Sequence, residues 1–132
     1  MIRVGAGASK ALPDVLSRLG CSRPLLVTDS FIGSSGLMEP MQHALHDAGL
    51  RYAIFDGVVP DPTTQSLEAG LAMAMASECD VVVGFGGGSS IDSAKALACL
   101  AVNRRPLSSF KVPAVAPAGL PIVAVPSAHA GA

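Results

Sequence analysis

The chain is poor in aromatic and charged residues. Of its 132 residues, 4% are aromatic, none is tryptophan, and 14% are charged, while 50% are hydrophobic. The net charge is −1 with histidine neutral. Proteins that bind nucleic acid or an anionic membrane surface usually carry a basic patch. The basic pair Arg104 and Arg105 is expected to be ordinary solvated charge in a loop. We therefore predict neither nucleic acid nor a membrane as a partner.

Cysteines are few, and long apolar runs are missing. Cys21, Cys79 and Cys99 are odd in number, widely spaced and not in a CxxC motif. This pattern favours neither a disulfide framework nor a zinc site. No run approaches the roughly 20 apolar residues of a membrane span, and no leader of basic then apolar residues opens the chain. We expect reduced thiols in a cytoplasmic protein.

The length of 132 residues predicts one compact domain over residues 1–132. The apolar residues are mostly Ala, Val and Leu, which is typical of short buried strands covered by Ala-rich helices. A hydrophobic content of 50% is high for a free-standing domain. We expect one face to meet another domain or a second copy of the chain, as in a homo-oligomer.

Apolar periodicity and turn residues predict alternating strands and helices. Pro60 and Pro62 are expected to end the third strand, because proline lacks the amide that a sheet ladder needs. An irregular stretch is expected at 103–119, where three prolines fall. The predicted strands are 1–4, 25–28, 52–55, 81–85 and 122–125, and the predicted helices are 10–19, 38–48, about 64–77 and about 91–100.

Strands separated by helices predict an α/β fold with a parallel sheet and right-handed crossovers. Ligands of such sheets bind at the carboxyl ends of the strands. Asp29, Pro60, the glycine run 86–88 and Ser127 each follow a predicted strand. We therefore expect them at one edge of the sheet.

The glycine run is the strongest local signal for a binding site. Gly86, Gly87 and Gly88 join an apolar strand to a helix, and Ser89 and Ser90 follow. Glycines let a ligand approach the backbone, and the unpaired amides of a helix start attract phosphate. The run matches neither GxGxxG nor a Walker loop. It favours the phosphate of a nucleotide or sugar phosphate, with a ligand-free turn as the alternative.

Residues 86–95, GGGSSIDSAK, closely resemble the signature of the iron-containing (group III), metal-dependent alcohol dehydrogenase family, which includes lactaldehyde reductase and maleylacetate reductase. Residues 26–29 resemble its first nucleotide-binding strand, and 59–63 its Pro-Asn-Pro loop, with Asp61 in place of Asn. Residues 120–126 resemble the strand before its Thr-rich cofactor loop. The resemblance covers essentially the whole chain.

The resemblance implies the family's N-terminal, Rossmann-like dinucleotide-binding domain, without its C-terminal all-helical metal domain. In this domain, Gly86, Gly87, Gly88 and Ser89 would bind the cofactor pyrophosphate, and Ser127 would contact the cofactor. The segment after Ser127 departs from the family's Thr-Thr-Ala-Gly-Thr-Gly, which puts contacts near the nicotinamide in doubt.

Asp29 matches the family's acidic residue at the end of the first nucleotide-binding strand. Its carboxylate would accept hydrogen bonds from the adenosine ribose and repel the 2′-phosphate of NADP, so NAD is expected rather than NADP. The alternative is an aspartate that only caps a helix or turn.

The resemblance assigns no catalytic residue and no metal ligand to this chain. Iron or zinc would be held by the C-terminal domain. His43 and His46, three residues apart on a predicted helix, do not match the family's ligands. The implied function is NAD-dependent hydride transfer between the cofactor and a small alcohol or aldehyde, with this chain as the cofactor-binding part. The alternatives are an inactive nucleotide-binding module, a truncated remnant, or a domain of a dehydroquinate-synthase-like lyase.

Overall fold

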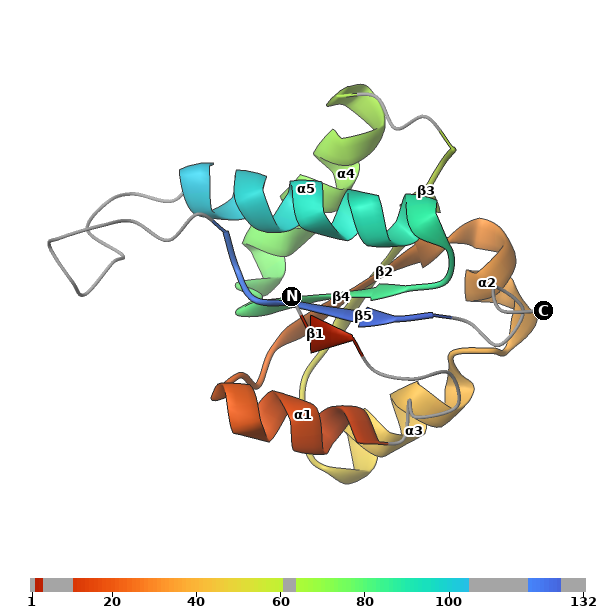
Figure 1. Ribbon diagram of the computed structural model, residues 1–132, viewed down its shortest axis with the longest axis vertical. Helices are drawn as coiled ribbons and strands as arrows, with labels where there is room; N and C mark the ends of the chain where they lie inside the picture. Colours follow the sequence, from red (N-terminus) through yellow and green to blue (C-terminus); the bar gives the residue numbers. More distant parts are fainter. Residues whose placement is uncertain (1, 4–10, 61–63, 105–118, 127–132) are drawn as a thin grey trace, which may run out of the picture.

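A computed structural model describes residues 2–3, 11–60, 64–104 and 119–126. These residues form three layers, with a parallel sheet between two layers of helices (Figure 1). The predicted α/β fold with a parallel sheet and flanking helices is confirmed.

Among the described residues, the sheet has five parallel strands in the order β1-β5-β4-β2-β3. Strands β2 and β4 pair in register from Pro24 with Val81 to Val27 with Gly84. Both are buried almost throughout, as expected of parallel strands covered on two faces. The strand bounds are Ile2–Arg3 (β1), Pro24–Asp29 (β2), Ala53–Val58 (β3), Val81–Phe85 (β4) and Ile122–Val125 (β5).

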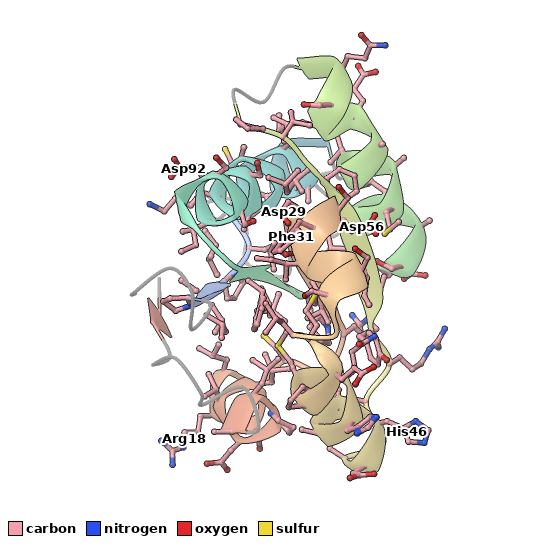
Figure 2. All side chains as sticks on the ribbon, turned by 90° about the vertical axis from the view of Figure 1, so that its right-hand side faces the viewer. Arg18, Asp29, Phe31, His46, Asp56 and Asp92 are labelled. Carbon is pink, nitrogen blue, oxygen red and sulfur yellow. The ribbon has the colours of Figure 1, made fainter. Side chains whose placement is uncertain are left out.

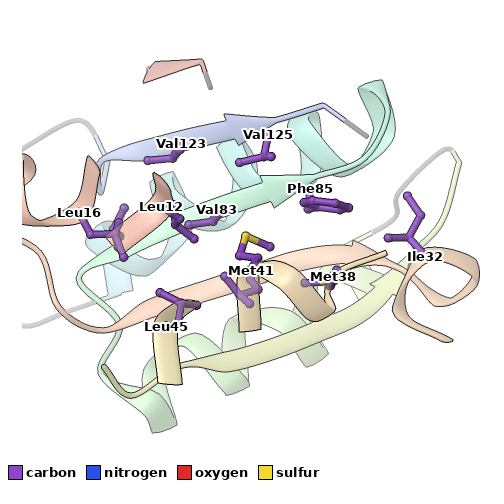
Figure 3. Packing of buried hydrophobic residues seen from close by; sticks show 12 residues of the cluster. Leu12, Leu16, Ile32, Met38, Met41, Leu45, Val83, Phe85, Val123 and Val125 are labelled. Atoms are coloured by element: carbon purple, nitrogen blue, oxygen red, sulfur yellow. The ribbon is translucent and has the colours of Figure 1, made fainter. Parts of the chain in front are cut away.

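The helices divide between the two faces of the sheet (Figure 1). One apolar cluster joins α1, α3 and Ile32 of α2 to one face, and Figure 3 shows Leu12 and Met41 pointing toward the sheet there. A second cluster joins α4 and α5 to the other face. The helix bounds are Leu12–Leu19 (α1), Ser30–Ser35 (α2), Glu39–Asp47 (α3), Thr64–Ser77 (α4) and Gly88–Arg104 (α5).

The structure departs from the predicted elements at three places. Helix α2 was not predicted, because six residues reading SFIGSS show no helical period. Strand β3 continues to Val58, three residues past its predicted end. Helix α5 begins at Gly88, inside the glycine run, and continues to Arg104, so the expected loop does not begin at residue 103.

Two polar contacts fix β2 against β4 at opposite ends. At the amino end, the Asp80 carboxylate accepts hydrogen bonds from the amides of Ser22 at 2.9 Å and Arg23 at 2.8 Å. At the carboxyl end, the buried Thr28 hydroxyl donates to the Phe85 carbonyl at 2.8 Å. These bonds fix the position of β2 along β4. They therefore also fix where the loops after the two strands begin.

Candidate dinucleotide-binding site

The glycine run forms the turn from β4 into α5 at the carboxyl edge of the sheet. Gly86 has a φ of +127°, a conformation that side chains other than glycine rarely adopt. A Cβ at Gly86 would lie 2.8 Å from Ile32 Cδ1, and the Gly86 amide donates to the Val125 carbonyl at 3.1 Å. Gly86 is thus required by the protein's own conformation and packing.

Gly87 and Gly88 have surroundings different from those of Gly86. Neither has a positive φ, and a Cβ added to either would meet nothing within 4 Å. The Ile91 amide donates to the Gly87 carbonyl at 3.2 Å, so the amides of Gly88, Ser89 and Ser90 precede this first bond of α5. Gly87, Gly88 and Ser89 are exposed. The helix start therefore places the amides of Gly88 and Ser89 on exposed residues, with partial positive charge from the helix dipole.

Asp29 ends β2 and caps α2. Its Oδ1 accepts a hydrogen bond from the Ile32 amide at 2.7 Å, so the cap expected as an alternative is present. Within the described part of the chain, Oδ2 has no hydrogen-bond partner, and the residue is half-buried. One oxygen holds the helix in place, and the other is available to a ligand.

Helix α2 links Asp29 to the glycine turn. Its Ile32 side chain fills the space beside Gly86, and its backbone lies against β3, where a Cβ at Gly33 would be 3.0 Å from Asp56 Cβ. Figure 2 shows Asp29 and Phe31 close together at the start of α2. The structure thus brings Asp29, Gly86, Gly87, Gly88 and Ser89 to one edge, whereas Ser127 lies outside the described residues.

Three residues that shape this edge were not singled out by the sequence. A Cβ at Gly84 would lie 3.1 Å from Ala94 Cβ and from Ile91 Cα, so this glycine lets α5 pack closely on β4. Thr28 bonds the end of β4, and Ile32 packs beside the turn. A glycine inside an apolar strand is a sequence signal of close backbone approach. Thr28 and Ile32 carry no such signal.

The model of the iron-containing alcohol dehydrogenase family matches residues 1–132. The chain belongs to this family. Among curated proteins, it is 36% identical over 123 residues to the NAD-dependent methanol dehydrogenase of Bacillus methanolicus, covering 92% of this chain and 32% of that protein. It is 33% identical over 126 residues to the lactaldehyde reductase of Escherichia coli K12, covering 93% of this chain and 33% of that enzyme.

Solved structures of the family have the same fold. A 1,3-propanediol oxidoreductase superimposes with a TM-score of 0.78 at 31% identity, over 95% of this chain and 33% of that chain. The chain therefore spans about a third of the length of the relatives that it matches, at their N-terminal part.

The described residues do not fit the metal of this family. They contain no group of three or more His, Cys, Asp or Glu side chains suited to a metal ion. His43 and His46 are both exposed on α3. His43 lines an open hollow of about 610 Å³ together with Glu39 and Asp47. The residues that line the hollow are Gly36 and residues of α3, and none of the residues expected to bind the cofactor is among them.

The cysteine thiols and the length of the helices bear on two other expectations from the sequence. Burial and the nearby Asp80 carboxylate raise the pKa of the Cys21 thiol, and Arg23 partly offsets this effect. Cys21 is half-buried, Cys79 is buried and Cys99 is exposed, and no disulfide joins them in the described part of the chain. None of the helices in the described ranges is long and apolar enough to cross a membrane.

Proposed function

We propose that this chain binds NAD at the carboxyl edge of its sheet, as the cofactor-binding part of an NAD-dependent oxidoreductase. The pyrophosphate would accept hydrogen bonds from the amides at the start of α5, next to Gly87, Gly88 and Ser89. The Asp29 carboxylate would accept hydrogen bonds from the adenosine ribose. Ser127 remains a proposed cofactor contact by resemblance alone.

The observation that carries this proposal is the open space at Gly87 and Gly88. A glycine inside a helix, as at Gly88, costs roughly 0.5–1 kcal/mol relative to alanine. Neither packing nor a positive φ requires glycine at these two positions. A ligand that lies against the backbone there accounts for both glycines, and an anion suits the amides at the start of α5.

Asp29 supports NAD over NADP. Oδ2 is available, and a 2′-phosphate on the ribose would bring a second negative charge close to this carboxylate. The methanol dehydrogenase relative, which is 36% identical to this chain, is itself NAD-dependent.

The proposed reaction is hydride transfer between the nicotinamide and the carbon of a small alcohol or aldehyde. The curated relatives named above are a methanol dehydrogenase and a lactaldehyde reductase, which favours a small substrate. This chain would bind and orient the cofactor. The proposal assigns no catalytic side chain and no metal ligand to the described residues.

Calorimetric titration of the full chain with NAD and NADP tests the proposal. We expect NAD to bind more tightly than NADP. Gly87→Ala should lower NAD affinity at least about tenfold, because the methyl group occupies the space next to the phosphates; that ratio corresponds to about 1.4 kcal/mol. Far-UV circular dichroism should show that the variant is folded. A folded wild-type chain that binds neither nucleotide would contradict the proposal.

A further inference from the structure

Phe31 is exposed at the carboxyl edge of the sheet. It lies on α2, two residues after Asp29, and 73% of its surface is accessible to solvent. A single exposed hydrophobic residue is common in folded proteins. Within the described ranges, however, only one other large hydrophobic residue is exposed, Val59 at 41%. The position of Val59, directly after β3, relates it to Phe31.

Phe31 and Val59 follow neighbouring strands at the same edge. Phe31 comes just after β2, and Val59 comes directly after β3. The two strands pair up to their ends, where Asp29 is the partner of Val58. The exposed apolar side chains of the described residues therefore lie next to Asp29, the residue proposed to bind the ribose.

The strand order places these groups in a row. Along the carboxyl edge, the glycine turn follows β4, Asp29 and Phe31 follow β2, and Val59 follows β3. Adjacent strands are about 4.8 Å apart, so the row extends for about 10 Å from the phosphate position. A dinucleotide that has its pyrophosphate at the turn and its ribose at Asp29 would bring its adenine to Phe31.

We propose that the Phe31 ring is the stacking surface for the adenine base, with Val59 as the adjacent apolar wall. This inference rests on the proposed NAD site and names the residue that binds its adenine end. Adenine has a flat π face, and aromatic side chains stack on such faces favourably. Figure 2 shows Phe31 beside Asp29 on the face of α2 that is open to solvent.

Phe31→Ala in the full chain tests this role by calorimetry. We expect the affinities for NAD and for ADP, which both carry adenine, to fall about tenfold. The affinity for nicotinamide mononucleotide, which lacks adenine, should not change. Ser34→Ala, at another exposed position of α2, is the matched control and should leave all three affinities unchanged.

Phe31→Trp provides a second, spectroscopic test. The chain has no tryptophan, so the new indole would be its sole source of tryptophan fluorescence. We expect ADP to quench this fluorescence saturably and nicotinamide mononucleotide to leave it unchanged. Arg18→Trp puts an exposed indole on α1, far from the edge, and should not respond to ADP.

The outcomes separate this inference from the proposed function. If wild-type chain binds NAD, but Phe31→Ala binds it equally well and Phe31→Trp is not quenched, the role of Phe31 is wrong and the NAD site stands. If folded wild-type chain binds neither NAD nor ADP, both proposals are wrong.

Discussion

Gly86 and Gly87 are neighbours in the sequence, but different physical requirements act on them. Gly86 has a φ of +127° and is packed against Ile32, so the fold itself requires glycine there. Gly87 has an ordinary φ and open space beside its Cα. The conformation and packing of the protein without ligand explain glycine at position 86. The proposed ligand explains glycine at position 87.

We predict opposite effects of alanine at these two positions on stability and binding. Gly86→Ala should lower the free energy of unfolding by about 2 kcal/mol, because alanine is strained at this φ. Gly87→Ala should leave it within about 0.5 kcal/mol of wild type while weakening NAD binding. Chemical denaturation of both variants measures the difference. Equal destabilisation by the two substitutions would show that Gly87 also has a structural role.

Glu78 is a residue in an unfavourable conformation at the end of α4. It has a φ of +52°, the only positive φ outside glycine in the described part of the chain. At the ends of α1 and α3, glycines occupy the equivalent position, Gly20 and Gly49, with φ of +74° and +73°. All three helix ends share the same pair of backbone hydrogen bonds, which for α4 join Glu78 to Met75 and Cys79 to Ala74.

Glu78→Gly should therefore stabilise the protein. Glycine adopts this conformation without strain, and the exposed Glu78 side chain has no salt bridge among the described residues. We expect the free energy of unfolding to rise by about 0.5–1 kcal/mol, measured by urea denaturation. Glu78→Ala is the control and should give a smaller change, since alanine keeps the strain. A loss of stability in Glu78→Gly would contradict this account.

At the scale of elements, α2 depends on its cap. The helix has six residues, and its apolar contact to the core comes from Ile32, the residue whose amide Asp29 binds. The same carboxylate is the proposed ribose ligand. A substitution that removes the carboxylate but keeps a capping oxygen separates the two roles.

Asp29→Ser and Asp29→Ala form such a pair. Serine is a good N-cap, so Asp29→Ser should stay within about 0.5 kcal/mol of wild type, whereas Asp29→Ala should lose about 1 kcal/mol. Both variants lack the negative charge, so the ratio of NAD affinity to NADP affinity should fall about tenfold in each. Thermal unfolding and calorimetry measure the two effects. If Asp29→Ser keeps the wild-type preference for NAD, Asp29 acts only as a cap.

The helices and strands that could be predicted from the sequence have a regular apolar pattern or a residue, such as glycine, that ends them. Strands β2 and β4 are continuous apolar runs, and α1 has apolar residues at helical spacing before Gly20. Helix α2 could not be predicted, because a capping bond and one buried side chain hold it rather than its own periodicity. The predicted start of α5 lies three residues after the observed one, because glycine has a low helix propensity and Gly88 is nevertheless the first residue of the helix.

At the scale of the whole molecule, topology decides what the site contains. The glycine run and Asp29 could be placed at the carboxyl edge from the sequence, because parallel strands all end on one side. The order of the strands could not be read from the sequence, and it is this order that makes β2 and β4 neighbours. The contact between Ile32 and Gly86 follows from that adjacency.

The proposed site also joins the two helix layers on either side of the sheet. Ile32 of α2 belongs to the apolar cluster of α1 and α3, whereas α5 belongs to the cluster of α4 on the other face. NAD bound between Asp29 and the start of α5 would contact both layers, so its binding should stabilise the domain as one unit. At a concentration about 100 times its Kd, NAD would add about 2.7 kcal/mol.

We therefore predict a single thermal transition whose Tm rises by about 10 °C with NAD, since about 1 kcal/mol shifts the Tm of a domain of this size by roughly 4 °C. Differential scanning calorimetry measures this shift, with circular dichroism as a second probe. Gly87→Ala should unfold at the wild-type Tm without NAD and show a smaller shift at the same NAD concentration. Two transitions, of which NAD moves only one, would show that the layers unfold separately and that the ligand is held by one of them.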